Sequence, residues 1–427
     1  MHELKYISDD EYKDALKTTV NFVGQKTNIS APHFVMFVRE YLNEKYGEDF
    51  VERGGLKVYT TLDWRLQQEA EKIISEGAAE NEKKYKAANA ALAALNPKTG
   101  QILAMVGSRD YFDIEKEGNV NVAIRPRMPG SAFKPFAYAA AIKKGFTSET
   151  VVFDVPTEFS PNTEQCPAEP NFSDNNKICY HPQNYDGKFR GPVSLRSSLA
   201  QSLNIPSVKT FYLAGINDTI NLAENMGITT LKDRSRYGLS LVLGAGDVKL
   251  LELASAYGVF AAEGVKTPPA AILKIEKTDG EILEEYAPQK TKVLDEQTAR
   301  QITDILSDNE ARAPMFGPSS PLYLGERPVA AKTGTTQNYQ DAWILGYTPS
   351  LVASVWVGNN RNQPMDRGGA GVSAAGPLWN KFMSFALEGE PIEVFNEPDL
   401  IQTAKPILNG QWLPSKKIKI DKISGKI

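Results

Sequence analysis

Three closely spaced apolar runs near the C-terminal end of the sequence constrain the fold more than any other feature. The runs cover residues 330–333, 342–347 and 351–358, and a short turn at 348–350 joins the last two. Short apolar segments with tight connections predict an antiparallel meander. Because the third run is apolar at nearly every position, we expect a strand that is covered on both faces.

A second pair of strands is predicted much earlier in the chain. Apolar residues run from Ala90 to Leu95, a Pro- and Gly-containing turn follows at 96–100, and the apolar pattern returns from Ile102 to Val106. This arrangement is typical of a β-hairpin. A further short hairpin is predicted within 266–286. The sequence therefore predicts antiparallel strands at 90–106 and again between 266 and 358.

Helices are predicted between these strands. The helix that contains Ser131 is expected to stop at Gly145, a suitable C-cap residue. A second helix is expected to start at 192–194 and to be interrupted at 204–206, because a residue before proline avoids the α region. Other helices are predicted after Asp63 as N-cap, after Val248, and over 295–306.

The composition is that of a globular protein. The chain has 427 residues, of which 41% are hydrophobic and 23% charged. Its formal net charge of −4 gives no electrostatic reason to expect nucleic acid as a partner. Because no window approaches the roughly 20 apolar residues that cross a bilayer, we expect no membrane segment in this chain.

The only two cysteines, Cys166 and Cys179, lie in one Pro- and Asn-rich stretch at 155–185. We predict that they form a disulfide that staples this loop in an oxidising compartment. Two alternatives stay open, namely two unlinked thiols and a metal site that adds His181. We expect no metal or organic cofactor.

Ser131 and Lys134 place a nucleophile and a base three positions apart at the start of a predicted helix. Residues i and i+3 share a helical face, so the serine Oγ is expected beside the lysine Nζ. Gly130 allows a sharp turn, and free N–H groups of the first helical turn point at whatever carbonyl the serine attacks. The alternative is an N-capping serine followed by a surface lysine.

Two later motifs favour the catalytic interpretation. The sequence contains Ser131-x-x-Lys134, Ser202-Leu203-Asn204 and Lys332-Thr333-Gly334-Thr335, in this order. Each motif is weak alone, but the ordered set resembles that of penicillin-binding proteins and β-lactamases, in which Asp stands at the position of Leu203.

Histidine is nearly unavailable as a base. His2 and His33 lie near the N-terminus, and His181 lies in the cysteine loop. Lysine must lose its proton first, and burial together with a second cation lowers a lysine pKa. We therefore expect Lys134 to take the Ser131 proton.

The second and third motifs then complete the proton path. We expect Ser202 to relay a proton toward the leaving amine, with Lys332 holding Ser202 in place. Backbone N–H groups of Ser131 and Thr335 would form the oxyanion hole. An edge strand at 332–335 can pair with an extended peptide, and Gly334 leaves room for its close approach.

The chain resembles the transpeptidase part of class A penicillin-binding proteins. Beyond the three motifs, the resemblance covers about 58–383 and includes segments at 59–63, 94–100, 184–187 and 341–349. It implies an α+β fold, with an antiparallel five-stranded sheet flanked by helices and a small N-terminal linker domain. Met128 stands where the family usually has Gln, and we expect this departure to affect local packing only.

The resemblance also implies an activity. It implies a D,D-transpeptidase in which Ser131 attacks the D-Ala-D-Ala bond of a peptidoglycan stem peptide and an amine of a neighbouring strand accepts the acyl group. The hydroxyls of Thr333 and Thr335 would bind the terminal carboxylate of the substrate, and Asn204 would hold its amide. β-Lactams would acylate the same serine.

Two kinds of alternative remain: another acceptor for the acyl group, and a function without catalysis. Water as the acceptor would make the chain a D,D-carboxypeptidase or a β-lactamase, but we find no carboxylate at recognisable spacing to activate it. A β-lactam sensor or wall-complex scaffold that keeps the acylated state is the non-enzymatic alternative.

We divide the chain into four parts. Residues 1–55 are expected to be a helical connector, 56–87 a linker strand and helix, 88–390 the transpeptidase domain, and 391–427 a C-terminal tail. Because 421–427 resembles the turn of the first hairpin, we expect a truncated tail. Too few residues precede the domain for the glycosyltransferase of a class A protein, so we expect no glycan polymerisation.

The expected surroundings follow from the resemblance as well. The parent protein is expected at the extracytoplasmic face of the bacterial cell membrane. Stem peptides, β-lactam antibiotics and cell-wall synthesis proteins are the expected partners.

Overall fold

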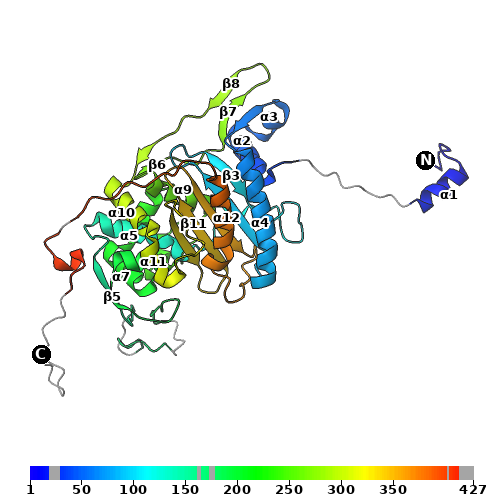
Figure 1. The fold of residues 1–427 in the computed structure, drawn as a ribbon. Helices are drawn as coiled ribbons and strands as arrows, with labels where there is room; N and C mark the ends of the chain where they lie inside the picture. The colour runs from blue at the N-terminus through cyan, green and yellow to red at the C-terminus, as the bar shows by residue number, and fades with distance from the viewer. Residues whose placement is uncertain (19–28, 161–164, 173–177, 402, 413–427) are drawn as a thin grey trace.

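A five-stranded antiparallel sheet forms the centre of the computed structural model, which describes residues 1–18, 29–160, 165–172, 178–401 and 403–412 (Figure 1). Its strand order is β10-β11-β12-β2-β3, with β10 and β3 at the edges. The strands are β10 (Ala330–Thr335), β11 (Asp341–Tyr347), β12 (Val352–Gly358), β2 (Asn89–Leu95) and β3 (Ile102–Val106). The predicted meander and hairpin are both present, and the predicted α+β fold class is confirmed.

The two faces of the sheet pack against different sets of helices because side chains alternate along each strand. On β2, Ala91 and Ala93 belong to one hydrophobic core, and Leu92 and Ala94 belong to the other. The first core includes α9 (Leu250–Ala261), α5 (Lys134–Lys143) and α10 (Glu296–Ser307), and the second includes α4 (Trp64–Tyr85) and α12 (Gly376–Ala386). The expectation that the third apolar run is covered on both faces is therefore confirmed.

The helical part of the molecule lies beside the edge strand β10. It consists of α5, α6 (Leu195–Ala200), α7 (Asn204–Ala214), α8 (Ile216–Asn225), α10 and α11 (Asn309–Phe316). Helix α10 packs on β10, and α5 packs on α7. This packing brings the start of α5, the α6–α7 connection and β10 together.

The start of α5 differs from the prediction. Ser131 lies in a 3₁₀ turn, η2 (Gly130–Phe133), and the α-helix begins only at Lys134. A 3₁₀ turn at a helix N-terminus is common. The helix ends at Lys143, and Gly145 follows with φ +94°, as the C-cap prediction requires.

The predicted interruption at 204–206 is wrong. Residues 192–194 belong to the strand β5 (Gly191–Ser194), which pairs with β4 (Val151–Asp154). The break between α6 and α7 lies at 201–203, and Pro206 is the third residue of α7. The first N–H groups of a helix have no partner within it, so proline costs little at that position.

The N-terminal helices α1 (Asp9–Lys17), α2 (Pro32–Tyr46) and α3 (Glu48–Arg53) precede β1 (Lys57–Thr60). Helix α2 does more than connect, because its Phe34, Val38 and Leu42 are buried in the first core. Strand β1 pairs with β7 (Ile272–Glu276), which pairs with β8 (Ile282–Glu285), so the predicted hairpin near 280 is present. The predicted N-cap Asp63 accepts a hydrogen bond from Leu66 N.

The remaining elements are short. They are β6 (Val265–Lys266), β9 (Thr291–Lys292), the 3₁₀ turns η1 (Val122–Ile124), η3 (Arg234–Arg236), η4 (Leu239–Leu243) and η6 (Pro406–Asn409), and the π-helical turn η5 (Gly371–Ala375).

The predicted disulfide between Cys166 and Cys179 is present. The two alternatives for these residues, free thiols and a metal site, are therefore wrong. His181, the third ligand of that metal site, instead contacts a carboxylate of its own loop, with 2.7 Å between its Nδ1 and Glu158 Oε2.

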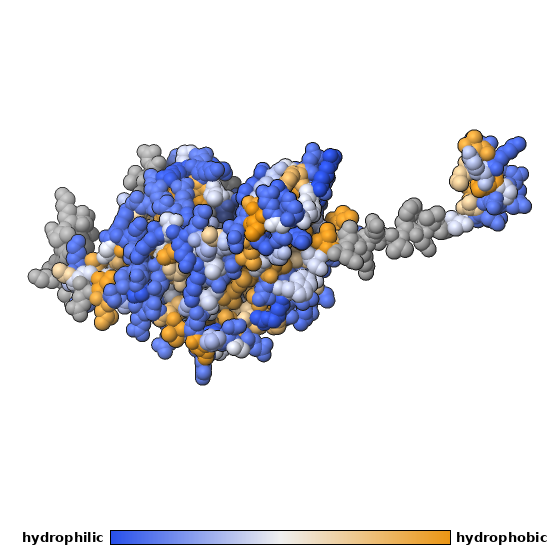
Figure 2. Space-filling model, turned by 90° about the horizontal axis from the view of Figure 1, so that it is seen from above, coloured by the Kyte–Doolittle hydropathy of each residue, from blue (hydrophilic) through white to orange (hydrophobic). Residues whose placement is uncertain are grey.

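The segment at 391–401 has no helix or strand, and η6 follows it, whereas 421–427, where we expected a truncated hairpin, lies outside the described residues. In the part of the chain that the structure describes, no helix is long and apolar enough to cross a membrane. The space-filling view in Figure 2 is mostly hydrophilic, with hydrophobic residues in small separate patches.

Candidate active site

The turn that carries Ser131 packs directly on the backbone of the edge strand β10. A Cβ atom on Gly130, whose φ is +55°, would lie 2.4 Å from Thr335 O. A Cβ atom on Gly334 would lie 2.2 Å from Pro129 O. Only glycine permits such an approach at both positions, so the Pro-Gly-Ser and Lys-Thr-Gly-Thr segments meet because each contains a glycine.

Two further hydrogen bonds fix this turn from behind. The buried Tyr257 on α9 donates to Ala132 O at 2.7 Å. Trp343 Nε1 on β11 donates to Met128 O at 2.8 Å. No local sequence pattern marks either contact.

Lys134 is fully buried at the start of α5, and its amine points to the α6–α7 connection. Its Nζ lies 2.7 Å from Ser202 O, 2.8 Å from Asn204 Oδ1, 3.1 Å from Leu203 O and 3.4 Å from Ser202 Oγ. Among the described residues, neither this amine nor that of Lys332 forms an ion pair with a carboxylate.

Lys332 contacts the same serine. Its Nζ donates to Ser202 Oγ at 2.7 Å and to Thr333 O at 3.0 Å. Ser202 has a φ of +61°, an uncommon backbone conformation for a residue other than glycine. Such strained residues cluster at functional sites. Ser202 is thus the meeting point of two buried lysines.

The buried environment lowers the pKa of both lysines. Burial, followed by the positive charge of Lys332, lowers the pKa of Lys134 well below its ordinary value. Burial alone lowers the pKa of Lys332 to about 7. Desolvation disfavours the ammonium form, and the two amines repel each other as cations. A neutral amine at neutral pH is what a general base requires.

A neutral Lys134 keeps a lone pair for a proton. A neutral amine has two N–H donors, and the two shortest contacts, Ser202 O and Asn204 Oδ1, use both. The Ser131 hydroxyl, which is partly exposed, has no hydrogen-bond partner among the described residues. The arrangement therefore has an unengaged hydroxyl and a buried base on the same helix start.

Asn204, the third predicted residue of the middle motif, is held at both ends of its amide. Its Oδ1 accepts from Lys134, and its Nδ2 donates to Gln183 O at 2.6 Å. Gln183 comes shortly after Cys179 in the chain, so the segment that follows the disulfide reaches the site.

The two threonines of the last motif lie on one face of β10, because they are two residues apart. Thr333 is buried, while Thr335 is partly exposed, and its Oγ1 accepts from Gly371 N at 3.0 Å. The glycine-rich run at 368–371 packs here against β10. A Cβ atom on Gly371 would lie 2.5 Å from Gly334 O.

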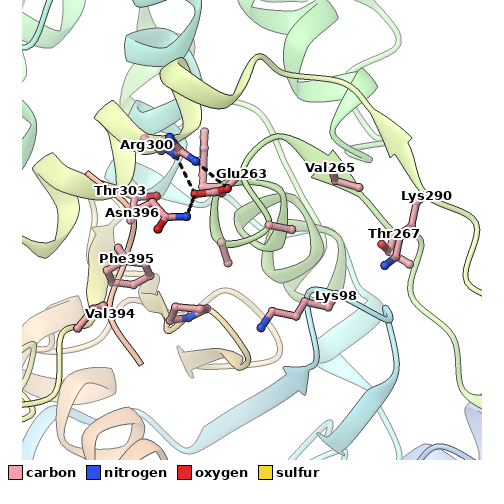
Figure 3. Close-up of a pocket in the computed structure, with 14 residues that line it drawn as sticks. Lys98, Glu263, Val265, Thr267, Lys290, Arg300, Thr303, Val394, Phe395 and Asn396 are labelled. Atoms are coloured by element: carbon pink, nitrogen blue, oxygen red, sulfur yellow. Dashed lines mark hydrogen bonds and ion pairs between the residues drawn. The ribbon is translucent and has the colours of Figure 1, made fainter. Parts of the chain in front are cut away.

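The cavity in Figure 3 lies apart from the candidate active site. It has a volume of about 330 Å³ and lies between α9, α10 and the C-terminal segment at 394–396. Arg300 and Asn396 both bind Glu263 there. None of the motif residues lines it.

Comparison with known proteins identifies the family and the fold. Residues 90–384 match the penicillin binding protein transpeptidase domain. The chain belongs to this family. Penicillin-binding protein 2D of Bacillus subtilis is 32% identical over 409 residues, which are 93% of this chain and 55% of that protein. Penicillin-binding protein 1A of Neisseria lactamica is 30% identical over 406 residues, 93% of this chain and 46% of that protein. The chain thus spans about half the length of these relatives.

Solved structures of the family show the same fold. One is the penicillin-binding protein PonA1 of Mycobacterium tuberculosis in complex with penicillin V. It superimposes with a TM-score of 0.72 at 25% identity, and the match covers 87% of this chain and 97% of the PonA1 chain. Another is penicillin-binding protein 1A of Haemophilus influenzae. It superimposes with a TM-score of 0.76 at 23% identity, and the match covers 97% of this chain and 79% of that protein's chain.

Proposed function

We propose that this chain is a peptidoglycan D,D-transpeptidase that works through an acyl-enzyme on Ser131. One observation carries the proposal. Two buried lysines with lowered pKa values, Lys134 and Lys332, both contact Ser202 Oγ. Family membership supports the reaction class, and penicillin V in the complex of PonA1 supports β-lactams as ligands.

Acylation moves one proton and exchanges one bond. Lys134 Nζ takes the proton of Ser131 Oγ as that oxygen attacks the carbonyl carbon between the two D-Ala residues. The backbone N–H groups of Ser131 and Thr335 stabilise the negative charge on the carbonyl oxygen. The C–N bond then breaks, and the proton passes from Lys134 through Ser202 Oγ to the leaving amine of D-Ala.

Deacylation repeats the sequence with a new nucleophile. The amine of a neighbouring stem peptide attacks the Ser131 ester, gives up a proton to Lys134 and forms the crosslinking amide. Lys332 holds Ser202 at 2.7 Å through both half-reactions.

Substrate binding uses the edge of β10. The donor peptide adds as an extended strand beside 332–335, with its terminal carboxylate at the hydroxyls of Thr333 and Thr335. Asn204 binds the substrate amide by exchanging its bond to Gln183 O for one to the substrate. A β-lactam acylates Ser131 by the same route, because its strained amide takes the place of the peptide bond.

The setting of the parent protein is part of the proposal. We place it at the extracytoplasmic face of the bacterial cell membrane, with cell-wall synthesis proteins as partners, and we retain 88–390 as the catalytic domain. The matched range 90–384 lies within these bounds.

Intact mass spectrometry after incubation with penicillin tests the nucleophile. We expect the chain to gain the mass of one penicillin, and Ser131→Ala to gain none. Wild-type chain without an adduct, or an adduct on Ser131→Ala, would refute the proposal.

Product analysis with a stem pentapeptide then separates the acceptors. Crosslinked dimers in the presence of an amine acceptor support transpeptidation, whereas shortened peptide alone identifies a carboxypeptidase. A stable adduct without turnover of stem peptide identifies a sensor or scaffold.

A further inference from the structure

A buried carboxylate and a buried amide lie behind the proposed base and carry no role in the proposed reaction. Asp154, at the end of β4, is fully buried, and Asn184, after the disulfide loop, is 4% exposed. Sequence reasoning placed Asn184 within a family-like segment but gave it no function.

Hydrogen bonds connect these residues to Lys134 in an unbroken chain. Asn184 Nδ2 donates to both oxygens of Asp154, at 2.9 and 2.8 Å. Asn184 Oδ1 accepts from the backbone N of Asn204 at 2.8 Å. Asn204 Oδ1 accepts from Lys134 Nζ at 2.8 Å.

The bond between Asp154 and Asn184 determines which way the Asn184 amide faces, and the bond from the backbone of Asn204 holds the start of α7 against it. The two carboxylate oxygens of Asp154 only accept, and Lys188 O accepts from Asn184 Nδ2 as well. The amide of Asn184 therefore has to turn its oxygen toward α7. There it binds the N–H of Asn204, the first residue of the helix, which has no partner within the helix.

We propose that Asp154 and Asn184 are positioning residues that fix Asn204 and, through it, the amine of Lys134 that accepts the Ser131 proton. This inference rests on the proposed acyl-enzyme function. Neither residue touches the substrate. Their effect is to keep an acceptor at a fixed distance from the base, which matters because small displacements of reacting groups reduce rates by large factors.

The alternative is that the pair only caps α7 and staples the loop. A cap changes the thermal stability of the chain but does not change how acylation depends on pH. Rate and pH profile together therefore distinguish a positioning role from a structural one.

The charged groups near Asp154 and Lys134 define the expected effect of pH on acylation. Arg190 Nη1 lies 4.0 Å from Asp154, Lys209 lies within its electrostatic influence, and Lys332 faces Lys134. Exchanging the two residues, as in Asp154→Asn combined with Asn184→Asp, keeps a donor opposite an acceptor between positions 154 and 184, removes the donor to Lys188 O, and moves the negative charge closer to Lys134. A closer anion favours the ammonium form of the base.

The experiment measures the second-order rate of acylation by a fluorescent penicillin from pH 5.5 to 9, with melting temperatures of each variant. We expect Asn184→Ala to acylate about 10- to 100-fold more slowly while it remains folded. We expect the exchanged double variant to recover most of the rate at pH 9, with the acid side of its profile moved to higher pH. Asp186→Asn is the matched control and should match wild type, because Asp186 lies in the same turn and, within the described part of the chain, its side chain bonds to Arg190 and Lys188 N but not to Asp154, Asn184 or Asn204.

Two outcomes overturn the inference. One is acylation of Asn184→Ala within twofold of wild type at every pH. The other, decisive if Asn184→Ala fails to fold, is a double variant with the wild-type pH profile. Failure of the wild-type chain to acylate at all would instead overturn the proposed function.

Discussion

Lys332 Nζ donates a 2.7 Å hydrogen bond to Ser202 Oγ, although the two residues are 130 positions apart in the sequence. The same hydroxyl lies 3.4 Å from Lys134 Nζ. A serine between two amines with lowered pKa values can pass protons in either direction, and this relationship underlies the predictions that follow.

Replacing Lys134 by methionine should remove the base and leave the buried volume nearly unchanged. We expect acylation of Ser131 to slow by about 10²- to 10⁴-fold, the usual range for loss of a general base. A time course of intact mass with penicillin measures the rate. Lys144→Met, a partly exposed lysine just after the same helix, is the control. Acylation of Lys134→Met at the normal rate would show that another group is the base.

Gly334→Ala should separate the nucleophile turn from the edge strand. The new Cβ would lie 2.2 Å from Pro129 O, so one of the two segments has to move. We expect acylation to fall by about 10²-fold, because a shift of about 1 Å is enough for such a loss. Gly238→Ala is the control, since its Cβ would meet nothing within 4 Å and its φ is −110°. Equal acylation rates in both variants would contradict the close contact.

Lys332 should make the stability of the fold depend on pH. Its pKa is lowered to about 7 from an ordinary 10.5, so between these values the unfolded chain binds a proton that the folded chain does not. The free energy of unfolding therefore rises with pH across this window, and the cost of burying the amine is fully present below pH 7.

Melting temperatures of wild type and Lys332→Met from pH 6 to 10 measure this effect. We expect wild type to gain stability relative to the variant as pH rises from 7 to 10. The exposed Lys290→Met should follow wild type at every pH. Parallel curves for wild type and Lys332→Met would mean that Lys332 titrates normally.

Asp341 should produce the opposite slope at acidic pH. Burial raises its pKa to about 6 from 3.8, despite a hydrogen bond from Trp356 Nε1 and the nearby charge of Arg127. Between these values the folded chain binds a proton that the unfolded chain does not, so stability falls as pH rises. Asp341→Asn keeps an acceptor for Trp356, and we expect wild type to lose stability relative to it from pH 4 to 6.5. A constant difference in melting temperature would contradict this pKa.

Local sequence patterns predicted most of the secondary structure because each pattern acts over a few residues. Short apolar runs with tight connections placed β10, β11 and β12, a Pro- and Gly-containing turn placed the β2–β3 hairpin, and Asp63 marked the start of α4. The prediction failed at Pro206, where burial of the first turn of α7 outweighed the preference of a residue before proline. That preference is small compared with the free energy of packing a helix.

The residues of the candidate site were found in the sequence because their chemical types and order are distinctive, but their individual roles remain proposals. Their geometry was not predictable in the same way. The contact of Lys134 with Ser202 O depends on the α6–α7 connection, and the contact of Trp343 with Met128 O depends on the sheet. Asn184 was overlooked because no short motif links it to Lys134.

The sequence by itself determined the α+β elements, the pairing of Cys166 with Cys179 and the identity of the candidate site residues, since side-chain type and short-range spacing are properties of the chain. Only the tertiary structure decided the left-handed backbone of Ser202, the depth at which Lys134 and Lys332 are buried, and hence their lowered pKa values. The physical reason is that desolvation and charge repulsion depend on what surrounds a group in space, and here those surroundings come from η2, the α6–α7 connection and β10, which meet only in the folded chain.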